Sequence, residues 1–258
     1  MTDLIELAAR FSEAAHESIK QVRKFTGEPY FQHPKRVAAM VEATGASDLI
    51  VAAAYLHDVV EDVPFDNVWS VALQFGFKAD DFAIDISADE NTAKFFVLDE
   101  FFGNYVSHLV SQVTDVSKPS DGNRKIRKEL DRQHLVKASP QAQTIKLADL
   151  IDNSHDIIQH DPDFAVTYMR EKGALLEVLT EGNKELWGWA NYIIEMYGKD
   201  PAWIDWTAVS IGVNQKKVLN KSIAGAKPGH RFENGKCLDC KAKFETAYKT
   251  CQAWGSSQ

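Results

Sequence analysis

The stretch Leu49–Asp62, LIVAAAYLHDVVED, joins an apolar run to four side chains that can bind protons or metal ions. Its first eight residues are apolar on every side of a helix, which is typical of a segment buried inside a domain. Val63-Pro64 then ends the helix, because the residue before a proline avoids the α region. The sequence predicts one helix that delivers His57 and Asp58 inward, with Glu61 and Asp62 four residues further on the same faces.

Helical spacing of apolar residues continues through most of the chain. We expect helices over 3–25, from His33-Pro34 onward, over 65–75, over 92–113, from Arg124 onward, over 141–158, over 163–180 and over 183–197. The acidic stretch 77–91 has little periodicity and is expected to be a surface excursion. Strand-like alternation of any length does not occur, and the fold class predicted from the sequence is all-α.

Composition limits the function classes. The chain has 258 residues, enough for one large domain and a small appendage. Its net charge of -8 argues against a broad basic surface for nucleic acid, although a metal-loaded acidic site can still bind polyphosphate. No apolar run of about 18 residues and no leader-like start occurs, so we expect a soluble, cytoplasmic protein without a membrane partner. The oligomeric state stays open, and neither a GxGxxG motif nor a P-loop is present.

Two histidines and two aspartates form a candidate metal site: His33, His57, Asp58 and Asp149. Divalent first-row metals take imidazole nitrogen and carboxylate oxygen, and a catalytic site leaves positions open for water and substrate. Glu61 and Asp62, one turn further along, are candidates to orient or deprotonate that water. Each residue alone also has a plain structural interpretation, since a His-Asp pair arises by chance and Asp149 can be a salt-bridged core residue.

The order of several motifs resembles one family. These are Arg23-Lys24, Gly27-Glu28-Pro29-Tyr30, His33-Pro34, Ala54 to Asp62, Phe75-Gly76, Val113-Thr114 and Lys146-Leu147-Ala148-Asp149 with Asn153. Over roughly residues 10–160 the chain is similar to the HD-type hydrolase domain of RelA/SpoT proteins and of the small alarmone hydrolases. The fold expected from this resemblance is an all-helical HD-domain bundle.

The resemblance also implies a site and a reaction. It implies one Mn²⁺ ion held by His33, His57, Asp58 and Asp149, and removal of the 3′-pyrophosphate of guanosine tetra- or pentaphosphate without synthesis of that nucleotide. Glu61 and Asp62 would position the attacking water. Arg23 and Lys24 would contact the nucleotide and Asn153 its ribose, and we add Lys146 on grounds of charge alone.

Two departures from the family pattern bear on these assignments. The Ala-His pair expected shortly before Arg23 is displaced upstream to Ala15-His16, so no role is assigned to His16. Residues 77–95 resemble an insertion that forms a lid or a contact surface. HD enzymes act on many phosphate compounds with one ligand set. The alternatives are therefore an HD phosphohydrolase of a dNTP, a nucleotide monophosphate or NADPH, and a non-catalytic metal- or nucleotide-binding module.

The C-terminal part has a character of its own. Residues 1–200 are expected to form the hydrolase domain, 201–226 a helical extension and linker, and 227–258 a small tail. All three cysteines of the chain lie in this tail. Cys237-x₂-Cys240, with His230 and Cys251, matches the four ligands of a structural zinc site, and Asn234-Gly235 predicts a hairpin turn. The alternative is three reduced thiols that lie together by chance.

Overall fold

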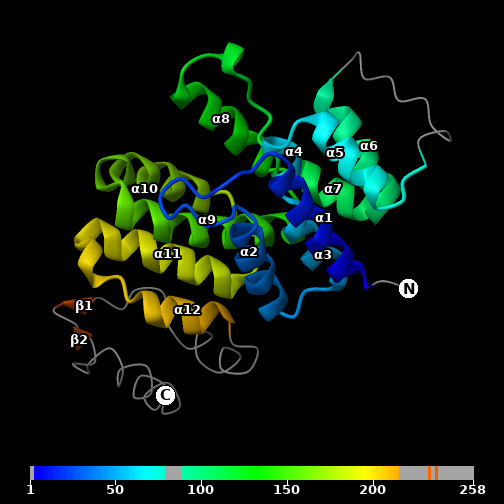
Figure 1. The fold of residues 1–258 in the computed structure, drawn as a ribbon. Coiled ribbons are helices and arrows are strands. Elements are labelled where there is room, and N and C mark those ends of the chain that lie inside the picture. The colour runs from blue at the N-terminus through cyan, green and yellow to red at the C-terminus, as the bar shows by residue number, and fades with distance from the viewer. Residues whose placement is uncertain (1–2, 79–88, 215–231, 234–235, 238–258) are drawn as a thin grey trace.

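The computed structural model describes residues 3–78, 89–214, 232–233 and 236–237 as an arrangement of packed helices (Figure 1). The helices are α1 (Leu4–Ser18), α2 (Gln32–Ala43), α3 (Asp48–Leu56), α4 (Val59–Asp62), α5 (Phe65–Gln74), α6 (Glu90–Phe102), α7 (Asn104–Val113), α8 (Arg124–Leu135), α9 (Pro140–His160), α10 (Pro162–Leu176), α11 (Lys184–Lys199) and α12 (Trp206–Asn214). The prediction of an all-α body is confirmed. None of the helices in the described residues has the length and apolar character needed to cross a membrane.

Helix α3 is a central element of the bundle. It packs against α1, α2, α7 and α9. The side chains of Val51, Ala52, Ala53, Ala54 and Leu56 are at most 1% exposed, which confirms the buried apolar run. Small alanine side chains let neighbouring helices approach closely, because the distance between helix axes depends on the residues at the contact. The end of α3 is thereby fixed deep in the protein.

Helix α9 is the second central element. Its N-terminus is capped by the Ser139 hydroxyl, which accepts a hydrogen bond from the Ala142 N–H at 3.3 Å, and Pro140 occupies the first helical position. It packs against α2, α7, α10 and α11 as well as α3. Figure 1 shows α10 and α11 alongside it. Residues about ninety positions apart in the sequence therefore meet where α3 and α9 touch.

Helix α1 is shorter than the predicted span of 3–25. It ends at Ser18, and Lys20 adopts a left-handed φ of 52°, which a helix cannot continue through. Val22 then pairs with Pro29 in an isolated antiparallel bridge. The apolar spacing runs on past the true end, yet Val22 is 55% exposed. As a result Arg23 lies on a loop and not on a last helical turn.

The predicted single helix over 49–62 is also wrong in one respect. Helix α3 ends at Leu56, and α4 begins at Val59 after a turn at His57 and Asp58. Asp58 has φ -95° and ψ -8°, and the His57 ring reaches back to the Ala54 carbonyl at 2.8 Å. This turn interrupts the helix, so His57 and Glu61 do not belong to one continuous helix as predicted.

The predicted helix over 92–113 is two helices. Gly103 separates α6 from α7 with φ 84°, a conformation that favours glycine. Helix α6 begins at Glu90, so the last residues of the predicted insertion 77–95 belong to a helix of the bundle. Residues 79–88 lie outside the described residues.

Helix α6 supports α4 through one lysine. Lys94 is 4% exposed, and its Nζ donates a hydrogen bond of 2.9 Å to the Val60 carbonyl in α4. The Glu90 carboxylate lies 3.2 Å from this Nζ and accepts from the Phe65 N–H at 2.7 Å. A buried ammonium needs such partners, because its desolvation is otherwise costly. The position of α4 therefore depends on α6.

The C-terminal tail is described only in part. Strands β1 (Phe232–Glu233) and β2 (Lys236–Cys237) pair antiparallel on either side of the predicted turn. The turn residues and the candidate zinc ligands His230, Cys240 and Cys251 lie outside the described residues, as do residues 215–231. The zinc prediction therefore stays a prediction.

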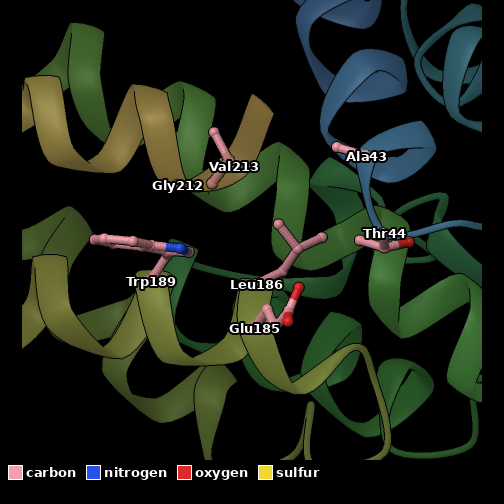
Figure 2. A pocket seen from close by; sticks show the side chains of 7 residues that line it. All are labelled: Ala43, Thr44, Glu185, Leu186, Trp189, Gly212 and Val213. Atoms are coloured by element: carbon pink, nitrogen blue, oxygen red, sulfur yellow. The ribbon is translucent and has the colours of Figure 1, made fainter. Parts of the chain in front are cut away.

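Helix α12 closes onto α2 and α11 around a small pocket (Figure 2). Trp189 and Leu186 of α11 point toward α12 in this view, and Ala43 lies at the end of α2. A Cβ atom at Gly212 would lie 2.1 Å from Cζ2 of Trp189, far inside van der Waals contact. Only a glycine lets α12 approach the indole this closely.

Replacing Gly212 with alanine is expected to lower the free energy of unfolding by about 1–3 kcal/mol, because the added methyl group displaces a packed indole. Urea unfolding followed by circular dichroism measures the change. Gly198 in α11 is the matched control, since a Cβ there meets nothing within 4 Å. Gly198→Ala is expected to raise the stability by up to about 1 kcal/mol through helix propensity. Equal effects of the two variants would contradict the close contact at Trp189.

Candidate metal centre and active site

Four side chains from three parts of the chain converge where α2, α3 and α9 meet. The ligand atoms of His33, His57 and Asp58 all lie within 4.8 Å of one another. Nε2 of His33 is 3.4 Å from Asp58 Oδ2 and 3.3 Å from Asp149 Oδ1. Nε2 of His57 is 3.1 Å from Asp58 Oδ1 and 3.9 Å from Asp149 Oδ1. The structure thus brings together the four residues named from the sequence.

The outward-facing nitrogens of the two histidines are held by protein acceptors. Nδ1 of His33 bonds Asp152 Oδ2 at 2.6 Å, and Nδ1 of His57 bonds the Ala54 carbonyl at 2.8 Å. Each Nδ1 is therefore the donor, which leaves Nε2 as a lone pair aimed at the cluster. Both Nε2 atoms are buried and have no hydrogen-bond partner among the described residues. Two buried imidazole acceptors without donors fit a metal ion between them.

The charge of the cluster leads to the same conclusion. Burial opposes ionisation of Asp58 and Asp149, but His57 and His33 beside the first and Lys146 beside the second hold the pKa of each carboxyl below its usual range. Burial also opposes protonation of His33, and its contacts with Asp149 and Asp152 outweigh this and raise its pKa. The carboxylates thus create a demand for positive charge. A divalent cation with mixed imidazole and carboxylate ligands satisfies that demand.

Glu61 and Asp62 lie on α4, the short helix that directly follows His57 and Asp58. Glu61 Oε1 accepts a hydrogen bond of 2.7 Å from the Asp115 N–H. Asp62 Oδ2 accepts one of 2.9 Å from Nε2 of Gln21. Desolvation raises the pKa of the Glu61 carboxyl, and the Asp115 and Asp58 carboxylates add to this, against Lys146. A carboxylate with a raised pKa beside a metal site suits a general base.

Two further residues support these carboxylates. The Tyr30 hydroxyl donates to Asp58 Oδ2 at 2.8 Å, which orients that side chain. His16 is 1% exposed, and its Nδ1 lies 2.6 Å from Oε1 of Gln21, the residue that bonds Asp62. The sequence spacing gave His16 no role. Its link to Asp62 depends on the turn after α1, which the helical pattern did not reveal.

The residues predicted to contact the substrate are placed differently from one another. Arg23 is 8% exposed and bonds Asp156 Oδ2 at 2.9 Å and Asn153 Oδ1 at 3.1 Å. Asn153 in turn donates through Nδ2 to Asp149. Lys146 Nζ lies 3.0 Å from Asp149 Oδ2, so its place is within the site. Lys24 is 74% exposed and turns to Asp161 at 3.3 Å. The structure therefore brings Arg23, Asn153 and Lys146 to the cluster and leaves Lys24 at its edge.

Asp152 was missed in the sequence. It lies in α9 three residues after Asp149, a spacing that places both on one helix face. Besides holding His33, its Oδ1 accepts from Nε of Arg36 at 2.6 Å. Burial opposes its ionisation, but His33 and Arg36 hold its pKa below the usual range. This helical spacing is the feature of the sequence that could have identified Asp152. The residue itself is not part of the motifs that identified the other site residues.

Replacing Asp152 with asparagine is expected to weaken Mn²⁺ binding about 10- to 100-fold, because an outer carboxylate orients the ligating imidazole and raises its basicity. Calorimetric titration of the metal-free protein with Mn²⁺ measures this. Asp163→Asn, at an exposed position in the first turn of α10, is the control and should bind Mn²⁺ like the parent. Unchanged affinity in Asp152→Asn would remove the proposed role of this residue.

Comparison with known proteins agrees with the all-helical fold. The family model described as HD domain matches residues 8–179, and the chain belongs to this family. Among its relatives is the guanosine-3′,5′-bis(diphosphate) 3′-pyrophosphohydrolase MESH1. The Drosophila melanogaster protein is 31% identical over 162 residues, which cover 60% of this chain and 73% of that protein. For the Homo sapiens protein the identity is also 31%, over 60% and 70% of the two chains.

Two other matches differ in extent. A Synechocystis protein named as a probable 3′-pyrophosphohydrolase of the same nucleotide is 31% identical over 40% of this chain but only 10% of its own length. A solved structure, titled as a metazoan ortholog of SpoT that hydrolyses ppGpp, shares 23% identity at a TM-score of 0.58. It covers 77% of this chain and 97% of that chain, and it supports the HD fold.

Proposed function

We propose that this protein is a metal-dependent phosphohydrolase that removes the 3′-pyrophosphate of guanosine tetra- or pentaphosphate and releases GDP or GTP and pyrophosphate. The observation that carries the proposal is Glu61 beside the cluster of His33, His57, Asp58 and Asp149. The relatives named for this reaction, with about seven tenths of their length covered, supply the substrate class. A pure binding module has no need of a carboxylate placed to accept a proton.

The proposed mechanism assigns each side chain a task. The four cluster residues hold one divalent ion, for which we propose Mn²⁺. When bound, such an ion neutralises phosphate charge and lowers the pKa of a water molecule. Glu61 takes a proton from the attacking water, and Asp62, fixed by Gln21, orients that water. The water oxygen bonds to the phosphorus that carries the 3′-oxygen, the bond between that phosphorus and the 3′-oxygen breaks, and the proton that Glu61 took from the water is passed to the departing 3′-oxygen.

Binding of the nucleotide falls to residues around the cluster. Lys146, held by Asp149, offers positive charge to the phosphates. We propose that Arg23 contacts the nucleotide and Asn153 its ribose, from positions that they already hold through each other and Asp156. Lys24 would have to leave Asp161 to take part. The net charge of the chain is -8, so this local positive charge, with the metal, has to attract the substrate.

The experiment that tests the proposal uses purified protein with Mn²⁺ and a panel of ppGpp, pppGpp, dNTPs, a nucleotide monophosphate and NADPH. Products are separated by anion-exchange chromatography. Release of pyrophosphate from ppGpp and pppGpp alone is the expected result. Turnover of only dNTPs or NADPH would reject the proposed activity on ppGpp and would indicate an HD phosphohydrolase with another substrate. Bound Mn²⁺ without any turnover would favour a binding module.

For the tail we propose one Zn²⁺ ion bound by His230, Cys237, Cys240 and Cys251, in a unit over 227–258 that comes after the hydrolase domain of 1–200 and the extension of 201–226. A unit this small depends on its metal to fold. Elemental analysis of the full chain tests this, since about one zinc per chain is expected to be retained by the parent and lost in a Cys237→Ala, Cys240→Ala variant. Equal zinc in both proteins would reject the site.

A further inference from the structure

Three lysines on successive helices act on one another electrostatically: Lys128 of α8, Lys146 of α9 and Lys172 of α10. The first two have carboxylate partners. Lys128 Nζ lies 2.7 Å from Asp115 Oδ2 and 3.3 Å from Asp131 Oδ2, and Lys146 Nζ lies 3.0 Å from Asp149 Oδ2. Their charges are therefore balanced within the protein.

Lys172 is different. No carboxylate of the described residues lies within 4.0 Å of its Nζ. It contacts the ring of Tyr168, whose centroid is 4.8 Å from the Nζ atom. The adjacent Glu171 is turned to Arg124 of α8, at 2.8 Å. The ammonium of Lys172 thus contacts an aromatic ring and forms no direct ion pair with a carboxylate of the described residues.

Printed contacts aside, hydrogen bonds and ion pairs connect the segment around Lys172 to the candidate site. The Glu61 carboxylate accepts a hydrogen bond from the Asp115 N–H, the Asp115 carboxylate pairs with Lys128 of α8, and Arg124, one turn earlier in α8, pairs with Glu171 next to Lys172. Desolvation lowers the pKa of its ammonium, repulsion by Lys146 and Lys128 lowers it further, and Asp149 and Asp115 act in the opposite direction. Of these groups, Asp149 and Lys146 belong to the cluster region, and Asp115 bonds Glu61 through its N–H. The Arg124–Glu171 ion pair joins α8 to α10 across this region. A partly buried ammonium without a directly paired carboxylate is unfavourable. The negative charge of an anion that binds in the site would stabilise it.

Lys172 has no carboxylate partner among the described residues and follows Glu171, whose ion pair with Arg124 joins α10 to α8. From this arrangement we infer that Lys172 binds a phosphate group of the substrate. The phosphate concerned is one that extends beyond the group held at the metal cluster. This inference rests on the proposed function for its substrate, while the anion site itself can be tested apart from it. Lys172 acts in binding and holds no proton of the reaction.

The first test compares Lys172→Met with Lys172→Arg in the Mn²⁺-loaded full chain. We expect Lys172→Met to raise the KM for ppGpp about 10- to 100-fold, the loss typical of a charge-assisted hydrogen bond, with kcat within about threefold of the parent. Lys172→Arg should recover most of the affinity. Lys199→Met, at the exposed end of α11, is the control and should behave like the parent. An unchanged KM in Lys172→Met would overturn the inference.

Thermal unfolding without substrate separates binding from a structural role. A methionine keeps the apolar stem and removes an uncompensated charge, so Lys172→Met should melt at the same temperature as the parent or higher. If the lysine served the fold, its removal would lower the melting temperature. A lowered melting temperature together with an unchanged KM would count against the inference on both grounds.

Calorimetric titration of the Mg²⁺-loaded proteins with inorganic phosphate makes the result independent of the reaction. We expect binding by the parent and by Lys199→Met, and binding at least about fivefold weaker by Lys172→Met. If ppGpp is not hydrolysed but this difference appears, the proposed function fails and the anion site stands. If ppGpp is hydrolysed and the variants bind phosphate equally, or the parent shows no binding at millimolar phosphate, the anion site is rejected.

Discussion

Replacing Asp149 with alanine is expected to abolish metal binding and hydrolysis together. The carboxylate faces both histidine Nε2 atoms and also pairs with Lys146, so its loss removes a ligand and leaves a buried ammonium unbalanced. We expect the affinity for Mn²⁺ and the turnover of ppGpp each to fall by more than about 100-fold, beyond the effect of losing an outer-shell partner. Elemental analysis after gel filtration and product release by chromatography measure the two quantities.

The control for Asp149 is Asp163→Ala, an exposed aspartate in α10, which should keep both properties. Circular dichroism checks that Asp149→Ala is folded. A folded Asp149→Ala protein that retained Mn²⁺ at parent affinity would show that this aspartate is not a ligand. If it lost Mn²⁺ but hydrolysed ppGpp at the parent rate, the metal would have no part in the reaction.

Replacing Glu61 with glutamine is expected to lower kcat about 10²- to 10⁴-fold while Mn²⁺ binding stays at the parent level. The amide oxygen can still accept the hydrogen bond from the Asp115 N–H, so the local geometry is preserved. What the amide cannot do is take a proton from water. Turnover of ppGpp at saturating substrate and calorimetric titration with Mn²⁺ give the two values.

The matched control for Glu61 is Glu177→Gln, at an exposed position after α10, which should have the parent rate. Turnover at the parent rate in Glu61→Gln would show that its assigned role is wrong. Loss of Mn²⁺ in this variant would instead make Glu61 part of the metal site. Comparison of the Asp149→Ala and Glu61→Gln variants distinguishes residues that bind the metal ion from residues that act in the hydrolysis.

The buried helices were accessible from the sequence because burial follows from local apolar patterns. Helices α3 and α9 lie where the patterns predicted. Their contact brings His57 and Asp58 close to Asp149. The positions at which these helices end could not be predicted from the sequence. Lys20 takes a left-handed φ, and the chain turns at Asp58, where no proline or glycine announces a break. The predicted helix over 92–113 includes Gly103. Its φ of 84° is not helical, and two helices meet there.

The sequence named the four residues that lie together in the candidate site and did not name the residues that support them. His33, His57, Asp58 and Asp149 stand out because their residue types and motif context are specific. Asp152, Tyr30 and Gln21 are ordinary residue types whose importance depends on contacts between distant segments. Lys172 is a clearer case, because its distinction is the lack of a carboxylate partner among the described residues, and that depends on where every neighbouring carboxylate points.

The hydrogen bond from Lys94 to the Val60 carbonyl has a consequence for the motions of the protein. Local opening in proteins occurs in cooperative units, and a buried bond between two helices joins them into one unit. Helix α4 has only four residues and cannot persist by itself. Fraying of α6 should therefore release Glu61 and Asp62 at the same time, and hydrogen exchange at Asp62 should follow the protection of α6. Residues 90–95 of α6, which fall in the stretch that resembles an insertion, would then determine how long Glu61 and Asp62 keep their positions.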